Sequence, residues 1–431
     1  MEKFINKLYL SEIIKLIRND EIKLIDFINL ICDRIEDIDT KIQSFLPEKG
    51  RRERLLKEAK ELESHWPDKS NRPPLYGLLV GVKDIFIADG FPTKCGSELP
   101  EELFSGKEAK SLTILKNSGA LVLGKTVTTE FAYFEPGPTR NPYNINHTPG
   151  GSSSGSAAAV AAGLCPVAFG TQTIGSIIRP ASYCGIVGFK PTYGRIPTDG
   201  VIPFSQTVDH VGFFTQEIDG AKIIASILCN NWKNNDDNKL PVIGIPEGKY
   251  LEQADPETLN IFENTISKLI SAGFKVKRIQ TFENIENINK FHRQIAAYDM
   301  AKVHEEWYKK YKTLYRYNTE KIILDGQAVT QDELYFALMH QTVLRDEITN
   351  IMKTSGIDLW ICPSTQGDAP EGISSTGSPV MNLPWTYIGF PVISIPTGKS
   401  KRNLPLGLQL ISSWMNDEFL FYCAKLIFDA I

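Results

Sequence analysis

Short runs of apolar residues alternate along the chain with longer stretches in which apolar positions recur every three or four residues. The runs L-Y-G-L-L-V-G-V-K-D-I-F-I (75–87), A-L-V-L-G-K (120–125) and C-P-V-A-F-G (165–170) contain few polar breaks, as is typical of strands buried on both faces. The segment 109–118, between the first two runs, predicts a helix. This alternation predicts an α/β fold built on a mixed sheet.

The rest of the chain continues the alternation. Residues 1–66 predict a helical N-terminal segment, and the polar stretch 230–240 resembles a linker. Beyond it the pattern predicts strand 241–246, a helix over 256–273 closed by glycine, strand 274–279, a largely helical region over 283–354, and strands 358–363, 390–396 and 405–411. We therefore expect a single domain over 1–431. Its core at 75–229 and second part at 241–431 would share one sheet, with helices covering both faces.

Composition removes several function classes. The 431 residues are 42% hydrophobic with a formal net charge of −4, which allows a large core but gives no reason to expect nucleic acid. No stretch approaches the ~20 apolar residues that span a bilayer, and the N-terminus lacks the apolar run of a signal peptide. The seven cysteines form no C-x-x-C pair, which fits reduced thiols in a cytoplasmic protein. No spacing indicates a metal, and no cofactor is implied.

The stretch T-P-G-G-S-S-S-G-S-A-A-A-V-A-A-G (148–163) places four serines directly before an alanine-rich run that predicts a helix. A flexible linker is one interpretation, but loosely ordered sequence should then flank it. A phosphate loop would need the lysine of G-x-x-x-x-G-K-[ST], which is missing, although glycines before a helix can still hold an anion. We favour a loop whose hydroxyls and backbone are held at a helix N-terminus for chemistry.

The neighbouring segment extends this interpretation. Residues 170–197 read G-T-Q-T-I-G-S-I-I-R-P-A-S-Y-C-G-I-V-G-F-K-P-T-Y-G-R-I-P, and G-V-K-D stands at 81–84. Together with the serine-rich loop and the later L-W-I-C-P-S and G-F-P-V-I-S-I-P-T-G segments, they closely resemble the amidase signature family of serine hydrolases. The resemblance covers most of the chain and implies that family's fold.

The resemblance also implies a Ser-Ser-Lys triad. Carried over by motif position, Ser176 in I-G-S-I would be the nucleophile and Lys83 in G-V-K-D the general base. Ser152 would be the bridging serine that relays protons, with a cis peptide bond before it. The other serines of the loop would cap the following helix and hold the loop: Ser153, Ser154 and Ser156.

Physical chemistry is consistent with these roles. A serine hydroxyl is a poor nucleophile until a neighbour removes its proton. A lysine with its ordinary pKa of about 10.4 is charged at neutral pH, but burial can lower that value by ~3–5 units. The apolar L-L-V-G-V before Lys83 provides such surroundings. The alternative is an exposed lysine at a strand end, paired with Asp84.

Backbone N–H groups would form the oxyanion hole, and the resemblance places them at Thr173, Ile174, Gly175 and Ser176. Many family members read T-D-T-G-G-S-I-R, whereas this chain has Gln172 for the acid and Ile174 for the first glycine. Its arginine, Arg179, lies one place later. A branched residue at Ile174 requires a negative φ, or the hole is altered. These departures argue against the tRNA-dependent amidotransferase A subunits.

The substrate contacts are less specified. Besides the triad, the candidates are Cys95, Gly151, Gln172 and Arg179. Cys184 is expected to pack in the core, because no histidine partner is near. The aromatic-rich region 283–354 indicates either an apolar or aryl acyl group or helices packed on the sheet. The loop 367–379 offers hydroxyls and N–H groups for a polar substrate end, or is a loop without a ligand.

We therefore expect an amidase that hydrolyses a linear carboxylic amide through an acyl-enzyme on Ser176. Its partner would be a small-molecule amide, with no nucleic acid and no membrane span. The oligomeric state stays open, a homodimer included. One alternative is an acyl transferase or amidotransferase, in which an amine or ammonia replaces water. The other is a catalytically inactive scaffold, which the intact Lys83, Ser152 and Ser176 set disfavours.

Overall fold

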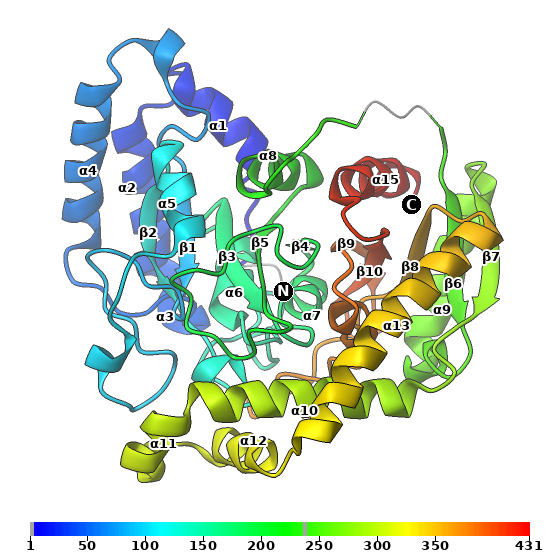
Figure 1. Ribbon diagram of the computed structural model, residues 1–431. Coiled ribbons are helices and arrows are strands. Elements are labelled where there is room, and N and C mark those ends of the chain that lie inside the picture. Colours follow the sequence, from blue (N-terminus) through cyan, green and yellow to red (C-terminus); the bar gives the residue numbers. More distant parts are fainter. Residues whose placement is uncertain (1–3, 236–238) are drawn as a thin grey trace.

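One mixed sheet runs across the molecule (Figure 1). The computed structural model describes residues 4–235 and 239–431, so residues 236–238 of the predicted linker lie outside the described residues. The strands are β1 (Leu79–Lys83), β2 (Leu121–Thr126), β3 (Val167–Gln172), β4 (Val187–Lys190), β5 (His210–Thr215), β6 (Val242–Glu247), β7 (Lys275–Gln280), β8 (Leu359–Pro363), β9 (Val392–Lys399) and β10 (Pro405–Ile411). Their order is β2-β1-β3-β5-β4-β9-β10-β8-β6-β7. This confirms the predicted α/β fold with a mixed sheet.

The strand directions bring two functional segments to one edge of the sheet. β1 is parallel to both β2 and β3, with Val80 opposite Val167 and Lys83 opposite Thr126. The centre from β3 to β8 is antiparallel, and β8, β6 and β7 are parallel again. Because parallel strands end at the same edge, the last residues of β1 and β3 emerge side by side.

The helices alternate with these strands. They are α1 (Leu10–Arg18), α2 (Leu24–Arg34), α3 (Thr40–Ile42), α4 (Arg51–His65), α5 (Lys110–Asn117), α6 (Ser154–Ala161), α7 (Ile178–Tyr183), α8 (Ile218–Leu228), α9 (Pro256–Ser271), α10 (Ile285–Val303), α11 (Glu305–Tyr311), α12 (Tyr317–Gln327), α13 (Gln331–Ser355), α14 (Leu383–Tyr387) and α15 (Asp417–Ala430). In Figure 1, α10 to α13 lie along one rim of the molecule. Among the described residues, no helix is both long and apolar enough to cross a membrane.

The two faces of the sheet carry separate cores. Val80, Val82 and Phe169 belong to a cluster that packs against α8 and α15, whereas Leu79 and Ala168 face a cluster built around α6. α6 is buried along its whole length, because its alanines and glycine let it lie directly on the strands. All seven cysteines are buried thiols, Cys184 among them.

Local signals explain where the longer helices begin and end. The Asp255 side chain accepts a hydrogen bond from the backbone N–H of Thr258 at the start of α9. At the start of α13, Thr330 and Glu333 form a capping box, and Gly356 ends the helix with a φ of 59°. These caps stabilise the ends of two helices, α9 and α13, whose apolar faces are not strongly developed.

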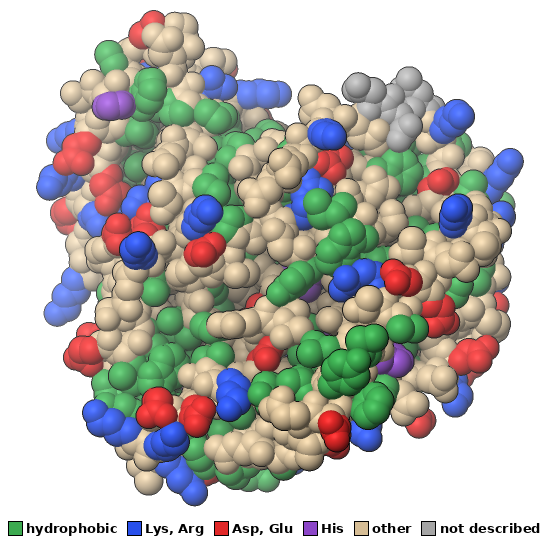
Figure 2. Space-filling view, viewed as in Figure 1, with side chains coloured by type: hydrophobic (Ala, Val, Ile, Leu, Met, Phe, Trp, Pro, Cys, Tyr) green, Lys and Arg blue, Asp and Glu red, His purple; other side chains and the backbone are tan. Residues whose placement is uncertain are grey.

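The aromatic residues of the 283–354 region divide into two groups. Trp307 and Tyr315 pack with His304 against Phe131, which joins the helices to the body of the fold. Three others are exposed on α12 and α13, together with Met339 and Val343, and Figure 2 shows apolar side chains at the surface: Tyr317, Tyr335 and Phe336. The contacts of the first group favour helix packing over the predicted acyl pocket.

A buried ion pair ties the loop after β4 to α15. The Asp417 carboxylate accepts hydrogen bonds from the Thr192 backbone N–H and hydroxyl, at 2.8 and 2.7 Å, and from Arg195 at 3.0 Å. Both charged side chains are almost fully buried, and Arg195 also pairs with Glu418 at 2.8 Å. Removing Asp417 would leave Arg195 with Glu418 alone and would take away the acceptor of the two Thr192 groups.

We predict that Asp417→Ala lowers the free energy of unfolding by about 3–5 kcal/mol in urea denaturation. Asp429→Ala is the matched control, because Asp429 lies on the same helix, more than half exposed, and pairs only with Lys425. That change should cost less than about 1 kcal/mol. Equal losses for both variants would contradict this account of the buried pair.

Candidate active site

Lys83, the last residue of β1, ends in a cluster of hydroxyl groups. Its Nζ lies 2.7 Å from Ser152 Oγ, 3.1 Å from Ser153 Oγ and 2.7 Å from Thr171 Oγ1. The side chain is fully buried. The alternative of an exposed lysine is therefore wrong, and Asp84 instead pairs with Lys125 at 2.9 Å.

Burial controls the charge of this lysine. Desolvation lowers the pKa of Lys83 from 10.5 to about 7, because the charged form has no carboxylate in contact with it. Asp209 acts weakly in the opposite direction from a distance. A substantial share of the amine is thus neutral near pH 7 and able to accept a proton.

The serine-rich loop reaches Lys83 through two glycines. Gly150 and Gly151 take φ values of 83° and 51°, a region that favours glycine, and the chain turns there. The expected cis peptide bond before Ser152 is wrong: the described chain contains no cis peptide bond, because the positive φ angles make the turn. A Cβ on Gly151 would lie 3.2 Å from the Ser176 carbonyl oxygen, so the two serine segments are packed together.

The other serines hold this loop rather than cap the helix. Ser153 is the N-cap residue of α6, yet its side chain makes no capping hydrogen bond, so that expectation is wrong. Its hydroxyl lies within hydrogen-bond distance of Lys83 and the Thr171 backbone. Ser156 donates to the Phe169 carbonyl at 2.7 Å, and the Ser154 hydroxyl is buried without a partner. The physical reason is that β3 lies against this loop, so the Ser153 and Ser156 hydroxyls donate to carbonyls of β3.

Ser176 lies in the turn between β3 and α7, which Gln172 organises. The Gln172 side-chain oxygen accepts hydrogen bonds from the N–H groups of Ile177 and Ile178, at 2.8 and 3.0 Å. Its amide nitrogen donates to Thr386 Oγ1 at 2.8 Å. Both ends of the buried amide are therefore occupied by the protein, and Gln172 holds the turn rather than facing a substrate.

Two side chains from distant segments fix the peptide planes of this turn. His292 Nε2 lies 2.8 Å from the Thr173 carbonyl oxygen, and Thr386 Oγ1 donates to the Ile174 carbonyl at 2.7 Å. Burial lowers the pKa of His292 to about 4, so the ring is neutral. In a trans peptide the C=O and N–H point in opposite directions. The N–H groups of Ile174 and Gly175 therefore point away from His292 and Thr386.

These N–H groups are not used elsewhere in the described parts of the chain. No acceptor is found there for the N–H of any residue from 173 to 176. Ile174 has a negative φ, so the branched side chain is accommodated. A Cβ on Gly175 would lie 2.4 Å from Asn382 Oδ1, which explains why the second glycine of the motif is kept.

The remaining candidates lie around this centre. Cys95 is fully buried with a positive φ, and burial raises the pKa of its thiol well above the ordinary value. It packs near Lys83 and Asp84 as a neutral group. Arg179 is buried on α7, where its guanidinium donates to the Gly377 carbonyl at 2.6 Å and lies 3.3 Å from Thr376 Oγ1.

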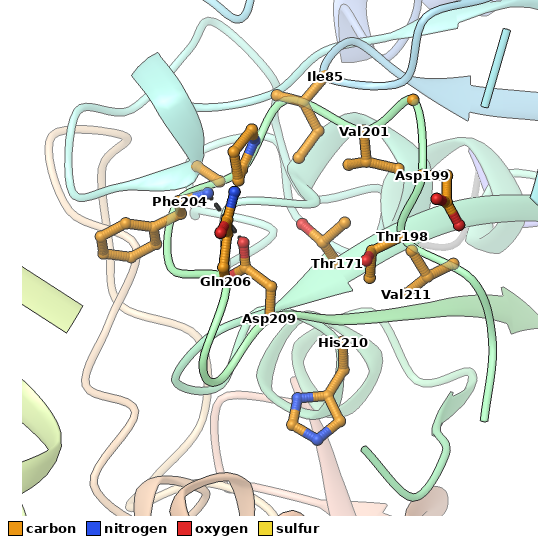
Figure 3. A pocket seen from close by; sticks show the side chains of 13 residues that line it. Ile85, Thr171, Thr198, Asp199, Val201, Phe204, Gln206, Asp209, His210 and Val211 are labelled. Atoms are coloured by element: carbon orange, nitrogen blue, oxygen red, sulfur yellow. Dashed lines mark hydrogen bonds between the residues drawn. The ribbon is translucent and has the colours of Figure 1, made fainter. Parts of the chain in front are cut away.

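A cavity of about 420 Å³ opens beside Thr171 (Figure 3). Asp209 lies in its wall, accepts a hydrogen bond from the Thr173 hydroxyl at 2.5 Å and is bonded to the N–H groups of Phe204 and Ser205. Burial raises the pKa of Asp209 to about 6. Sequence reasoning missed this residue, although an acid directly before the strand 210–215 was a usable signal.

The structure thus brings Lys83 and Ser152 into contact and packs the segment of Ser176 against them. Thr171, His292 and Thr386 were not anticipated, since they become neighbours only through the fold. In residues 4–235 and 239–431, no group of three or more His, Cys, Asp or Glu side chains is placed to hold a metal ion.

Comparison with known proteins shows the family to which the chain belongs. The model of the Amidase family matches residues 26–421. The chain belongs to the amidase family. Among its relatives, the A subunit of the Glutamyl-tRNA(Gln) amidotransferase of Gloeothece citriformis (strain PCC 7424) is 30% identical over 446 residues, which cover 91% of each chain.

Solved structures agree with the family assignment. A crystal structure of an amidase aligns with a TM-score of 0.88 and 26% identity, over 98% of this chain and 99% of that chain. The native peptide amidase from Stenotrophomonas maltophilia aligns with a TM-score of 0.82 and 23% identity, over 100% and 98% of the two chains. The second likeness concerns the fold alone. The proteins similar to this chain thus include one that is called an amidase and one that is a subunit of an amidotransferase.

The lowered pKa of Lys83 predicts a pH-dependent stability difference between wild type and Lys83→Met. Between pH 7 and 10.5 the unfolded lysine binds a proton that the folded one has lost, so wild-type stability rises with pH relative to the variant. The gain should be at most about 1.4 kcal/mol per pH unit, measured by urea denaturation from pH 7 to 9. A difference that stays constant over this range would show that Lys83 keeps its proton.

Proposed function

We propose that this protein is an amidase that hydrolyses a linear carboxylic amide through an acyl-enzyme on Ser176. The observation that carries the proposal is the buried contact of Lys83 Nζ with Ser152 Oγ at 2.7 Å, beside the Ser176 segment. A neutral amine in this position is a base, and a hydroxyl in contact with it can relay a proton.

The proton balance follows from the contacts. Neutral Lys83 donates its two N–H groups to Ser153 and Thr171 and accepts the Ser152 proton on its lone pair. Ser152 in turn takes the proton of Ser176 as the Ser176 oxygen bonds to the amide carbon. The relay then runs backwards, so that the leaving amine receives the proton as the C–N bond breaks. Water repeats the attack and releases the acid.

The developing oxyanion would be held by backbone N–H groups. The N–H groups of residues 173–176 have no acceptor in the described chain. His292 and Thr386 bind the carbonyls of Thr173 and Ile174 and so fix the orientation of two of these peptide planes. N–H groups that are already in position stabilise the developing negative charge without having to reorient. In many enzymes this electrostatic stabilisation is the largest single contribution to the rate enhancement.

The second candidate is amide transfer, in which an amine or ammonia takes the place of water. The identity with the A subunit of an amidotransferase favours it. The two reactions share the acyl-enzyme and differ only in the nucleophile that resolves it. Gln172 and Ile174 depart from the T-D-T-G-G pattern common in the family, so we place hydrolysis first.

We predict that a fluorophosphonate probe labels Ser176 once per chain, detected by intact mass. Ser176→Ala should remove the adduct, and Lys83→Met should slow labelling by at least about 100-fold, because the base is lost. Ser154→Ala is the matched control, since its hydroxyl is buried in the same loop without a partner. An adduct that survives Ser176→Ala would refute the assignment of the nucleophile.

Adding hydroxylamine to a reaction with a labelled amide separates the two candidates. Hydrolysis yields only the free acid, whereas efficient transfer yields the hydroxamate. A product that is mainly hydroxamate at low hydroxylamine concentration would move the assignment to the transferase.

We predict that Thr386→Val slows fluorophosphonate labelling by about 10- to 100-fold, because the peptide plane of Ile174 loses its anchor. Thr386→Ser keeps the hydroxyl and should restore most of the rate. For an amide substrate the loss should fall on kcat rather than KM. Equal defects in the valine and serine variants would show that packing, and not the hydrogen bond, is what matters.

A further inference from the structure

β3 and β5 stop pairing where the turn that carries Ser176 begins. The last residues of the two antiparallel strands that lie opposite each other are Gln172 and His210. The next pair, Thr173 and Asp209, is joined through side chains instead: Thr173 Oγ1 donates a hydrogen bond to Asp209 Oδ1 at 2.5 Å. Because this bond uses the hydroxyl, it holds Thr173 without occupying its backbone N–H, which has no acceptor among the described residues.

The second oxygen of Asp209 holds the loop that leads into β5. Asp209 Oδ2 accepts hydrogen bonds from the N–H groups of Phe204 and Ser205, at 2.8 and 2.9 Å (Figure 3). All these donors are neutral, and the described chain places no cationic side chain within ion-pair distance of the carboxylate. An acid without a counter-charge is a costly way to fill space, so its hydrogen bonds need a functional explanation.

Helix α10 contacts both the turn and this loop. His292 Nε2 lies 2.8 Å from the Thr173 carbonyl oxygen. Seven residues later, Asp299 Oδ2 accepts hydrogen bonds from the Ser205 hydroxyl and the Thr207 N–H, at 2.7 and 3.0 Å. Residues seven apart lie on one face of a helix. The turn and the loop are thus fixed to the same face of α10.

Thr173 has two anchors, one on its carbonyl and one on its hydroxyl. A single hydrogen bond to the carbonyl lets the peptide plane rotate about that bond, whereas a second bond through the side chain of the same residue fixes the plane. The peptide that joins Thr173 to Ile174 contains this carbonyl and the Ile174 N–H, which point in opposite directions. Fixing the plane therefore fixes the direction of an N–H group of the turn.

The charge of Asp209 has two opposing effects on the reaction. Asp209 acts on Lys83 from a distance and favours its protonated form, which arises when Ser176 attacks. The same negative charge disfavours an oxyanion at the nearby turn. Because these effects oppose each other, we expect the hydrogen bond, rather than the charge, to determine what Asp209 contributes.

We propose that Asp209 is a positioning residue of the candidate active site: by binding the Thr173 hydroxyl, it sets the direction of the backbone N–H groups that would hold the oxyanion. The inference rests on the proposed function, because it assigns a role in the same site. His292 and Thr386 hold carbonyls of the turn from helices, whereas Asp209 holds a side chain from the end of a fully buried strand. An anchor on a rigid strand keeps the turn in place before the substrate arrives.

The first test measures the rate of fluorophosphonate labelling of Ser176 at pH 8, where a carboxyl with a pKa of about 6 is ionised. Thr173→Val should slow labelling by at least about 10-fold, because valine cannot donate to Asp209. Thr173→Ser keeps the hydroxyl and should restore most of the rate. For an amide substrate the loss should fall on kcat rather than KM, because the oxyanion exists only beyond the ground state.

A double-variant cycle tests whether Asp209 acts through Thr173. Asp209→Ala should slow labelling at least as much as Thr173→Val. Adding Thr173→Val to Asp209→Ala should then cost less than about 3-fold more, because the bond between them is already lost. Thr265→Val is the matched control. The Thr265 side chain is also buried and hydrogen-bonded, but to Ile261 and Thr397 on α9 and β9, so labelling should stay within about 2-fold of wild type.

Hydrogen exchange followed by mass spectrometry tests the anchor without any turnover. The N–H groups of residues 177–179 close the turn through hydrogen bonds within it. Both Thr173→Val and Asp209→Ala should speed exchange in a peptide over 177–179 by at least about 10-fold. Only Asp209→Ala should also speed exchange at 204–205, because valine at position 173 leaves the hydrogen bonds of the loop intact. Circular dichroism melts show whether each variant is folded.

The outcomes distinguish this inference from the proposed function. Faster exchange of the turn in both variants, with no labelling of Ser176 in any protein, would support the anchor and count against the amidase. Labelling and exchange that Thr173→Val leaves unchanged would overturn the positioning role and leave the amidase intact. A loss of labelling in Asp209→Ala alone would overturn it as well, because Asp209 would then act through its charge or through the loop.

Discussion

The removal of water from Lys83 is the constraint on which the rest of the site depends. The lysine ends a strand whose five residues are all buried, and α6 lies directly on the same strands. That packing requires the small residues of α6, because a Cβ on Gly155 would lie 2.4 Å from the Val127 backbone nitrogen. The same requirement explains why a serine- and alanine-rich segment follows Gly151. The need for small residues in α6 therefore accounts both for the hydroxyl groups near Lys83 and for the exclusion of water around it.

A lowered pKa alone does not identify a base. Burial also lowers the pKa of Lys190 to about 7, and this lysine ends strand β4 of the same sheet. Within the described residues, however, its Nζ donates hydrogen bonds only to the carbonyl oxygens of Pro191 and Phe390, which have no proton to give. Lys83 instead contacts three hydroxyls. The partners, and not the shift, decide that Lys83 can take part in proton transfer whereas Lys190 fastens two segments.

The sequence predicted what depends on local pattern or on motif. Apolar runs predicted β1, β2, β3, β6, β7, β8, β9 and β10, and the motifs pointed to Lys83, Ser152 and Ser176. It did not predict β4 and β5, which are short and lie among glycines, nor the strand order. Thr386 and His292 could not be predicted either, because they are 212 and 119 residues away in the sequence from the carbonyls that they bind. The Gln172 departure became intelligible only in the fold, where its longer side chain reaches two backbone N–H groups and Thr386 at once.

Arg179 and Lys83 show how one physical condition produces two kinds of chemistry. Both side chains are buried without a carboxylate in contact, and desolvation lowers the pKa of each. An amine starts low enough that burial brings it to neutrality, whereas a guanidinium starts so high that it stays charged. The same dry interior therefore makes a base of one residue and a fixed cation of the other.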